Sequence, residues 1–274
     1  MSLIPISDCE SAAAAKRPFV VCAAGNHTVE VRDIAPDITL NGVHVPMIEE
    51  SELSVGEEVG SGGWGIVYRA QYCGKSLQKV QHLTNVEYGS WGVKGTFALK
   101  KFQLAAFSGP NMQQDVAKRE MYLEFQREVS INGSLSHPKL VEMLGMVMDP
   151  SFGILMEFMN AGDLYKFIHD HTNELPWSRR IEFALDIAEG MRFLHSLKLL
   201  HQDLKSPNVL LNRSGDKLVA KIADFGLARE TESVAVGRSE VVNPTWLAPE
   251  VIQGARPTLK VLSQYLLLLL LLLL

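Results

Sequence analysis

The chain has 274 residues, of which 47% are hydrophobic and 21% charged, and this balance excludes a largely disordered protein. Lys and Arg number 26 against 31 Asp and Glu, a formal charge of −5, so we expect no nucleic-acid partner. The three cysteines, Cys9, Cys22 and Cys73, are too few and too far apart for a disulfide framework or a zinc site. They fit a reducing compartment, and we expect a cytoplasmic protein.

The first part of the chain predicts a loose terminus followed by short strands. Residues 1–17 are small and polar, whereas residues 18–47 combine β-forming residues with turn signals such as Asn41-Gly42. Further on, Val59 and Ile66 flank a cluster of glycines, which predicts a β-hairpin.

Two helices follow from the spacing of apolar residues. Residues 114–132 place Met121, Phe125 and Val129 on one side, with Gly133 as the expected end. The clearest amphipathic pattern covers residues 177–196. Its apolar side chains recur at three- and four-residue steps: Ile181, Ala184, Leu185, Ala188, Met191 and Leu194. Because strands come first and helices second, the sequence predicts an α+β fold with a strand-rich N-lobe, a helical C-lobe and a cleft between them.

The chain ends in nine leucines, residues 266–274. A bilayer span needs roughly 20 apolar residues, and Ser263 and Gln264 interrupt the run, so we expect no membrane span. The tail fits a low-complexity segment without a folded role.

The glycine cluster has the spacing of a phosphate-binding loop. Glycine lets backbone N–H groups approach phosphate oxygens without an intervening Cβ. The residues expected to cradle phosphate are Gly60, Ser61, Gly62, Gly63, Trp64 and Gly65, followed by Val67. Two other readings stay open, a dinucleotide-binding loop that opens a helix and a flexible turn without ligand. The β-forming residues 66–68 favour a returning strand over the helix.

An apolar strand ends in Lys100, which can pair with α- and β-phosphates. Glu128 shares the apolar face of its helix with Phe125 and Met121. A carboxylate on an inward face needs a cation, and we expect Lys100 to provide it.

The strongest signal is an Asp-x-x-x-x-Asn spacing followed by an Asp-Phe-Gly. Asp203 is predicted to accept a hydroxyl proton, Lys205 to neutralise the moving phosphoryl charge, and Asn208 and Asp224 to hold a metal ion. An Ala-Pro-Glu follows at residues 248–250. The order of these motifs is the one that phosphoryl transfer from Mg-ATP requires, so ATP and Mg²⁺ are the expected cofactors.

Residues 52–252 resemble a eukaryotic protein kinase of the tyrosine-kinase-like group. Within them, residues 124–129, 137–138 and 156–165 resemble the Roco family, which includes the leucine-rich-repeat kinases. Residues 35–40 resemble the segment that joins the COR domain to the kinase in that family. The resemblance implies that GTPase and COR domains accompany the kinase in the intact parent protein.

The resemblance also implies roles for individual residues. Met156 would be the gatekeeper, the Glu157 and Met159 backbones would bind adenine, and Asp163 would lie near the ribose. The residues that would sandwich the base are Val67, Ala98 and Leu210. Lys205 resembles the pattern of Ser/Thr-specific kinases, so the implied acceptor is a Ser or Thr hydroxyl of a protein.

The sequence departs from the family pattern at several places. Gln202 replaces an arginine that pairs with a phosphate on the activation loop, and Asn132 occupies a position that is usually apolar. Residues 73–95 form an insertion that we expect to be exposed. Only 24 residues follow Glu250, and from Val261 onward they no longer resemble the family, so the helical lobe is expected to be incomplete.

We therefore divide the chain into a linker-like segment (1–51), the kinase N-lobe and the start of the hinge (52–158), a partial C-lobe (159–260) and an aberrant leucine-rich tail (261–274). The predicted function is a protein Ser/Thr kinase. The alternatives are a catalytically dead kinase-like binding module and a truncated gene product.

Overall fold

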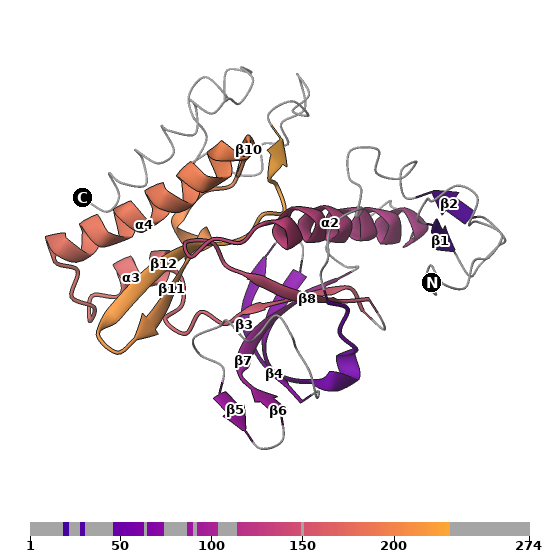
Figure 1. The fold of residues 1–274 in the computed structure, drawn as a ribbon, viewed down its shortest axis with the longest axis horizontal. Helices are drawn as coiled ribbons and strands as arrows, with labels where there is room; N and C mark the ends of the chain where they lie inside the picture. The colour runs from indigo at the N-terminus through magenta and orange to yellow at the C-terminus, as the bar shows by residue number, and fades with distance from the viewer. Residues whose placement is uncertain are drawn as a thin grey trace. The chain divides into compact units, whose positions relative to one another are not determined.

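The computed structural model describes residues 19–21, 28–30, 46–62, 65–73, 87–89, 92–103, 114–148 and 151–230 (Figure 1). The chain divides into two compact units, residues 1–134 with 144–155 and residues 135–143 with 156–274. Most strands and one long α-helix belong to the first unit, and the other described α-helices belong to the second, which confirms the predicted two-lobed α+β fold. The predictions for the end of the helical lobe and for the leucine-rich tail lie outside the described residues.

The first unit is built on a five-stranded sheet of order β3-β4-β7-β9-β8. These strands are β3 Leu53–Gly62, β4 Gly65–Tyr72, β7 Thr96–Phe102, β8 Met143–Val147 and β9 Gly153–Glu157. β4 pairs antiparallel with both β3 and β7. One face of the sheet is apolar and forms a core of Ile48, Leu53, Ala70, Tyr72, Phe97, Leu99, Leu144, Val147 and Leu155.

A short segment before β3 covers the free edge of β8. The Ile48 N–H donates to the Met146 carbonyl at 2.8 Å, and the Met146 N–H donates to the Pro46 carbonyl at 2.9 Å. The Ile48 side chain is buried over Gly145, where a Cβ would lie 2.3 Å from Ile48 Cδ1. This pairing therefore satisfies backbone groups that an edge strand otherwise leaves open.

The short 3₁₀ helix η3 (Glu50–Glu52) ties this segment to β7. The Glu50 carboxylate accepts hydrogen bonds from Lys101 Nζ and, at 2.9 Å, from Ser151 Oγ. Burial by itself would raise the pKa of Glu50, but these two hydrogen bonds and the positive charge of Lys101 together outweigh it and lower the pKa below its ordinary value. Glu50 is thus held as a carboxylate, and it binds the Lys101 side chain, which follows Lys100 on β7.

Helix α2 (Gln114–Ser134) continues through Gly133, so the expected helix end at Gly133 is wrong. One glycine in a last turn costs only about 1 kcal/mol relative to alanine, which is too little to end a packed helix. Phe125 and Val129 are buried as predicted. The Phe125 ring stacks on Phe152 at 5.1 Å and meets Phe102 edge-on at 5.6 Å.

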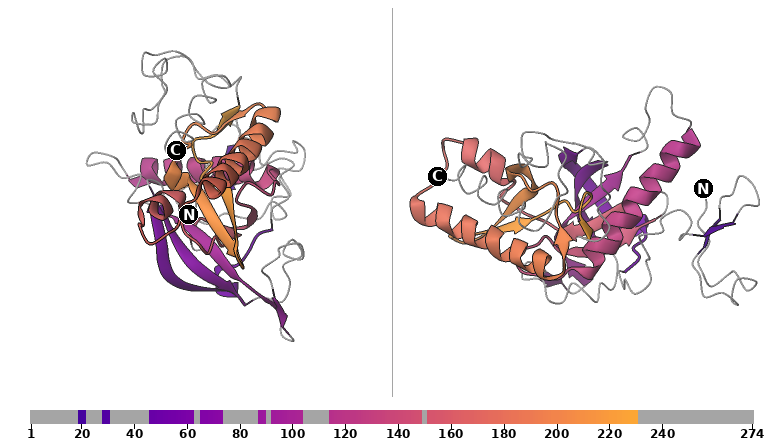
Figure 2. Two further views of the ribbon diagram at one scale, coloured as in Figure 1. Left: turned by 90° about the vertical axis from the view of Figure 1, so that its left-hand side faces the viewer. Right: turned by 90° about the horizontal axis from the view of Figure 1, so that it is seen from above.

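The second unit holds α3 (Leu164–His169), α4 (Trp177–Ser196), η6 (Ser206–Asn208), the hairpin of β11 (Val209–Ser214) and β12 (Lys217–Ile222), and the short pair of β10 (Leu199–Leu200) and β13 (Arg229–Glu230). α4 lies along β12 (Figure 2). The Ala220 N–H donates to Asp186 Oδ2 at 2.9 Å, and a Cβ on Gly190 would lie 2.9 Å from Ile222 Cδ1. The missing side chain at Gly190 therefore lets helix and hairpin approach closely.

The buried face of α4 differs in part from the predicted one. Met191 and Leu194 are buried as expected, but Ile181 and Leu185 are 55% and 64% exposed. Phe183 and Ile187 face inward instead. The helix carries two apolar stripes, and the contact of Gly190 with β12 selects the one that packs, which spacing alone does not reveal.

Two further antiparallel pairs are short. β1 (Phe19–Val21) pairs with β2 (Thr28–Glu30), which confirms short strands within residues 18–47. β5 (Glu87–Gly89) pairs with β6 (Gly92–Lys94) inside the 73–95 insertion. In the part of the chain that the structure describes, no helix has the length and apolar character needed to cross a bilayer.

Candidate active site

The glycine cluster forms the predicted hairpin between β3 and β4. Gly60 pairs with Val67 and Gly62 with Gly65, while Gly63 and Trp64 lie outside the described residues. Because the strand β4 begins at Gly65, the reading as a helix-opening dinucleotide loop is wrong.

The glycines of this hairpin differ in what requires them. A Cβ on Gly65 would lie 2.2 Å from the Lys101 carbonyl oxygen, so packing alone demands a glycine there. At Gly60 and Gly62 a Cβ would meet nothing within 4 Å, and Ser61 between them is exposed. Packing does not require glycine at positions 60 and 62, so both a phosphate-binding loop and a flexible turn without ligand stay open for this hairpin.

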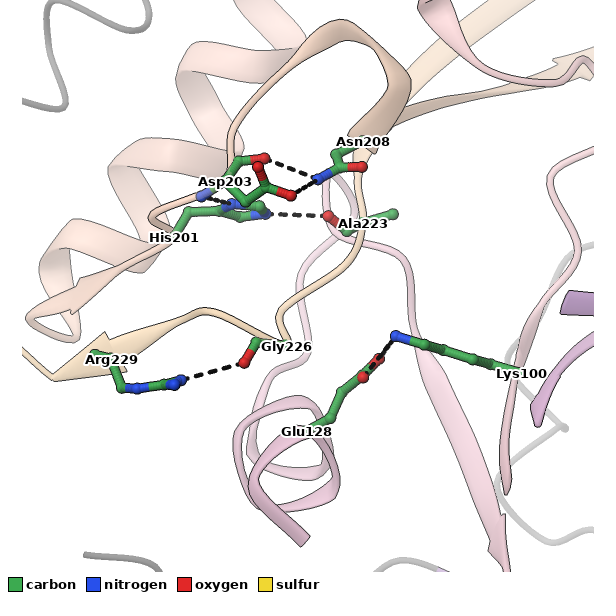
Figure 3. Close-up of polar contacts among 8 residues, drawn as sticks. All are labelled: Lys100, Glu128, His201, Asp203, Asn208, Ala223, Gly226 and Arg229. Atoms are coloured by element: carbon green, nitrogen blue, oxygen red, sulfur yellow. Dashed lines mark hydrogen bonds and ion pairs between the residues drawn. The ribbon is translucent and has the colours of Figure 1, made fainter. Parts of the chain in front are cut away.

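Lys100 and Glu128 form the expected buried ion pair (Figure 3). Lys100 Nζ donates to Glu128 Oε2 at 2.6 Å and to Oε1 at 2.8 Å, and the two side chains are 10% and 2% exposed. Val67 lies opposite Lys100 in the β4–β7 pairing, and Ala98 precedes Lys100 by two residues. Because cross-strand partners and alternate residues share one face of a sheet, β4 and β7 present Val67, Ala98 and Lys100 together.

Lys205 and Asn208 both donate to one carboxylate oxygen of Asp203, and Figure 3 shows the contacts of Asn208. Asp203 Oδ2 accepts from Lys205 Nζ at 2.8 Å and from Asn208 Nδ2 at 2.9 Å. Asn208 Nδ2 also donates to the Asp203 carbonyl at 2.8 Å. Both side-chain bonds thus end on Oδ2, and no hydrogen bond to Oδ1 is seen among the described residues.

His201 joins this loop to the Asp224 segment, a role that the sequence analysis missed. Its ring is fully buried, with Nε2 3.0 Å from the Ala223 carbonyl and Nδ1 3.3 Å from the Asp203 N–H. A carbonyl only accepts, so Nε2 carries the proton and Nδ1 accepts. Gln202 and Asp224, which follow the bonded residues, both adopt left-handed backbone with φ of 62° and 64°. Such strained conformations persist where surrounding bonds impose them.

We expect stability to fall in acid through His201. Burial lowers the pKa of His201 below its ordinary 6.5, outweighing the opposite effects of the Ala223 carbonyl and of the Asp224 and Asp203 carboxylates. As the pH falls below 6.5, the unfolded chain binds a proton that the folded chain refuses, so the free energy of unfolding decreases. Thermal unfolding between pH 7.5 and 5 measures this. His137 and His195 contribute in the same direction because burial lowers the pKa of each. His201→Gln should therefore reduce, but not abolish, the loss of stability between pH 7.5 and 5. An unchanged loss would show that His201 does not cause it.

Two oxygen donors fit a magnesium ion. Asn208 Nδ2 donates both of its hydrogen bonds to Asp203. These bonds orient the side-chain amide, whose oxygen Oδ1 is the acceptor for a ligand. Asp224 supplies a carboxylate from the neighbouring segment. Among the described residues no group of three or more His, Cys, Asp or Glu could hold a metal. This donor set suits Mg²⁺, which binds one or two side chains together with substrate phosphates.

Three of the residues predicted around the base form one apolar cluster with two others. Met159, Leu210 and the gatekeeper position Met156 pack with Val141 and Ala223. The Glu157 N–H is bonded to the Glu142 carbonyl at 3.1 Å and is therefore not available to a ligand. Val141 and Ala223 were not predicted, because only their packing marks them.

Asp163 has a local role that the sequence analysis did not name. Its Oδ1 accepts from the Lys166 N–H at 2.8 Å and caps α3, while Oδ2 lies 3.2 Å from Lys166 Nζ. A cap of this kind contributes about 1 kcal/mol. The Asp residue directly before an apolar helical pattern is the signal that predicts such a cap.

Replacing Asn132 by leucine should stabilise the protein. Asn132 is 4% exposed, and its Oδ1 has no hydrogen-bond partner among the described residues. A buried unsatisfied polar group costs about 1–3 kcal/mol, so we expect Asn132→Leu to raise the free energy of unfolding by about this amount. Urea denaturation should show a higher midpoint with an unchanged slope. Asn132→Ala, which leaves a cavity, should gain less. A lower midpoint for the leucine variant would show that the amide is satisfied.

The family model described as protein tyrosine and serine/threonine kinase matches residues 111–261, more than half of the chain. The chain belongs to this protein kinase family.

Curated relatives support the assignment. "Probable serine/threonine-protein kinase pats1" of Dictyostelium discoideum is 32% identical over 92% of this chain and 7% of its own length. "Probable serine/threonine-protein kinase roco5" of the same organism is 33% identical over 83% of this chain and 7% of its own. "Probable serine/threonine-protein kinase SIS8" of Arabidopsis thaliana is 35% identical over 74% of this chain and 17% of its own. The Roco resemblance is thus confirmed, and the chain spans only a small part of these relatives.

Proposed function

We propose that this kinase domain transfers the γ-phosphate of Mg-ATP to a Ser or Thr hydroxyl of a protein. The observation that carries the proposal is the fixed Asp203 carboxylate, whose Oδ2 is held by Lys205 and Asn208. Asp203 Oδ1 takes the proton of the acceptor hydroxyl. The hydroxyl oxygen bonds to the γ-phosphorus while the bond between the γ-phosphorus and the β–γ bridging oxygen breaks, which releases ADP. Lys205, 2.8 Å from Asp203, offsets negative charge on the transferred group.

The N-lobe residues bind the phosphates. The open positions at Gly60 and Gly62 let backbone N–H groups of the glycine loop reach phosphate oxygens. Lys100 contacts the α- and β-phosphates, and Glu128 holds it in place by the buried pair. Glu128 therefore acts through Lys100, as a positioning residue.

Asn208 Oδ1 and the Asp224 carboxylate would hold Mg²⁺, which would neutralise phosphate charge there. His201 links the segments that carry these two metal donors, because its ring accepts from the Asp203 N–H and donates to the carbonyl of Ala223, the residue before Asp224.

Adenine is the base that the hinge fits. The Glu157 N–H donates to the Glu142 carbonyl, so Glu157 offers its own carbonyl as an acceptor to the exocyclic amine of adenine. The Glu157 carbonyl would repel the O6 of guanine. Met159 provides the next backbone contact, and the family resemblance assigns Val67, Ala98 and Leu210 to the faces of the base. Asp163 accepts from the ribose with the carboxylate that caps α3.

The acceptor is assigned to Ser or Thr from two sources. The relatives pats1, roco5 and SIS8 are each named as probable serine/threonine-protein kinases. Lys205 also follows the pattern that the resemblance associates with this specificity.

Thermal unfolding with Mg-ATP tests the proposal and separates it from a binding module. Ligand at 100 times its dissociation constant stabilises the folded state by about 2.7 kcal/mol, so Mg-ATP should raise the Tm and Mg-GTP should raise it less. Phosphoamino-acid analysis of a labelled general substrate should then show phosphoserine or phosphothreonine. A Tm shift without any transfer would favour the kinase-like binding module, and label on tyrosine alone would contradict the Ser/Thr assignment.

The remaining assignments are proposals of the same kind. We retain the divisions at residues 51/52, 158/159 and 260/261, the location in the cytoplasm, and the presence of GTPase and COR domains in the intact protein. They rest on the composition and the family resemblance of the sequence.

A further inference from the structure

Glu157, at the end of β9, is held by its side chain from two directions. Its Oε1 accepts from the Glu142 N–H at 2.9 Å and from Lys221 Nζ at 2.6 Å, and its Oε2 accepts from Lys221 Nζ at 2.8 Å. The Lys221 and Glu157 side chains are only 16% and 11% exposed. A charge-assisted pair that engages both carboxylate oxygens at this burial is far more restrained than an exposed ion pair.

Lys221 connects the hinge to the strands that lead to the metal donors. It lies on β12 directly opposite Leu210 on β11, and it precedes Asp224 by three residues. Leu210 in turn packs with Met159 and Ala223. The ion pair thus joins the backbone group offered to the base with the hairpin that carries the apolar contact for the base.

We propose that Lys221 is a positioning residue that sets the affinity for the adenine base. Its pair with Glu157 holds the Glu157 carbonyl and the Met159 segment at a fixed spacing from Leu210, so the polar edge and the apolar face of the base are met together. Without Lys221, the hydrogen bond from the Glu142 N–H is the side-chain bond of Glu157 that remains among the described residues. The inference rests on the proposed function, since it assumes that residues 157–159 bind adenine.

The experiment compares two parts of the nucleotide. Calorimetric titrations measure the Kd of adenosine and of Mg-tripolyphosphate for the wild-type chain, Lys221→Met, Lys221→Arg, Glu157→Gln and the control Lys217→Met. Lys217 lies four residues earlier on the same strand and is exposed. We expect Lys221→Met and Glu157→Gln to weaken adenosine by about tenfold, the scale of one charge-assisted hydrogen bond. Mg-tripolyphosphate should bind unchanged, Lys221→Arg should restore most of the affinity, and Lys217→Met should match the wild type.

The outcomes separate the two proposals. If the wild-type chain binds neither probe, the proposed function fails. If the wild type binds adenosine and Lys221→Met binds it equally well, the positioning role is overturned. Equal weakening of both probes also overturns it, because a general loss of structure would produce that pattern. Should Lys221→Met fail to fold, Glu157→Gln still decides, since its amide oxygen can accept from the Glu142 N–H.

Discussion

Asp203→Asn should lower phosphoryl transfer by about 10²–10⁴-fold, the scale for loss of a general base, while Mg-ATP still binds. The asparagine keeps an oxygen for Lys205 and Asn208, which hold the carboxylate in the wild type, so the loop should retain its shape. What disappears is the basic oxygen that takes the hydroxyl proton. Steady-state kinetics should show the loss in kcat with little change in the KM for ATP.

Asp216→Asn is a matched control, because Asp216 lies in the exposed turn between β11 and β12. It should leave kcat unchanged. Equal turnover by wild type and Asp203→Asn would show that Asp203 is not the base, whereas loss of nucleotide binding in the variant would point to a structural role.

Breaking the buried ion pair from one side should cost about 3–5 kcal/mol of folding free energy. Glu128→Leu leaves the Lys100 ammonium buried without the carboxylate that it contacts at 2.6 Å. The double variant Lys100→Met/Glu128→Leu removes both charges and should recover most of this loss, because a buried pair is often replaceable by apolar side chains. Activity should not return, since the phosphate contact of Lys100 is gone. Urea denaturation and kinetics on the three proteins measure the two effects.

The exposed pair of Arg69 and Glu57 gives the control, with side chains 48% and 69% exposed at 3.4 Å. Glu57→Gln should cost less than about 1 kcal/mol. A Lys100→Met/Glu128→Leu variant as unstable as Glu128→Leu would contradict the claim that the loss comes from leaving one buried charge without its partner.

Local patterns predicted the parts of the site that depend on one element. Helical spacing placed Glu128 on the inward face beside Phe125, and the motif spacing named Asp203, Lys205 and Asn208, which the structure brings together. Their roles in transfer remain predictions that the proposed experiments test.

Contacts between distant segments were beyond the reach of the sequence. His201 bonds to the carbonyl of Ala223, and any residue type at position 223 provides a carbonyl. Lys221 is one of many lysines until its contact with Glu157, 64 residues away, is known. The prediction that Ile181 and Leu185 are buried was wrong for a related reason, because apolar spacing does not show which stripe of a helix another element covers.

The most direct test of the central claim is transfer of radiolabelled γ-phosphate from ATP to protein by the wild-type chain, with and without Mg²⁺ and beside Asp203→Asn. The account predicts Mg²⁺-dependent label on serine or threonine that falls by about 10²–10⁴-fold in the variant. A wild-type chain that binds Mg-ATP and transfers no phosphate, or that transfers it as fast as Asp203→Asn, would contradict it.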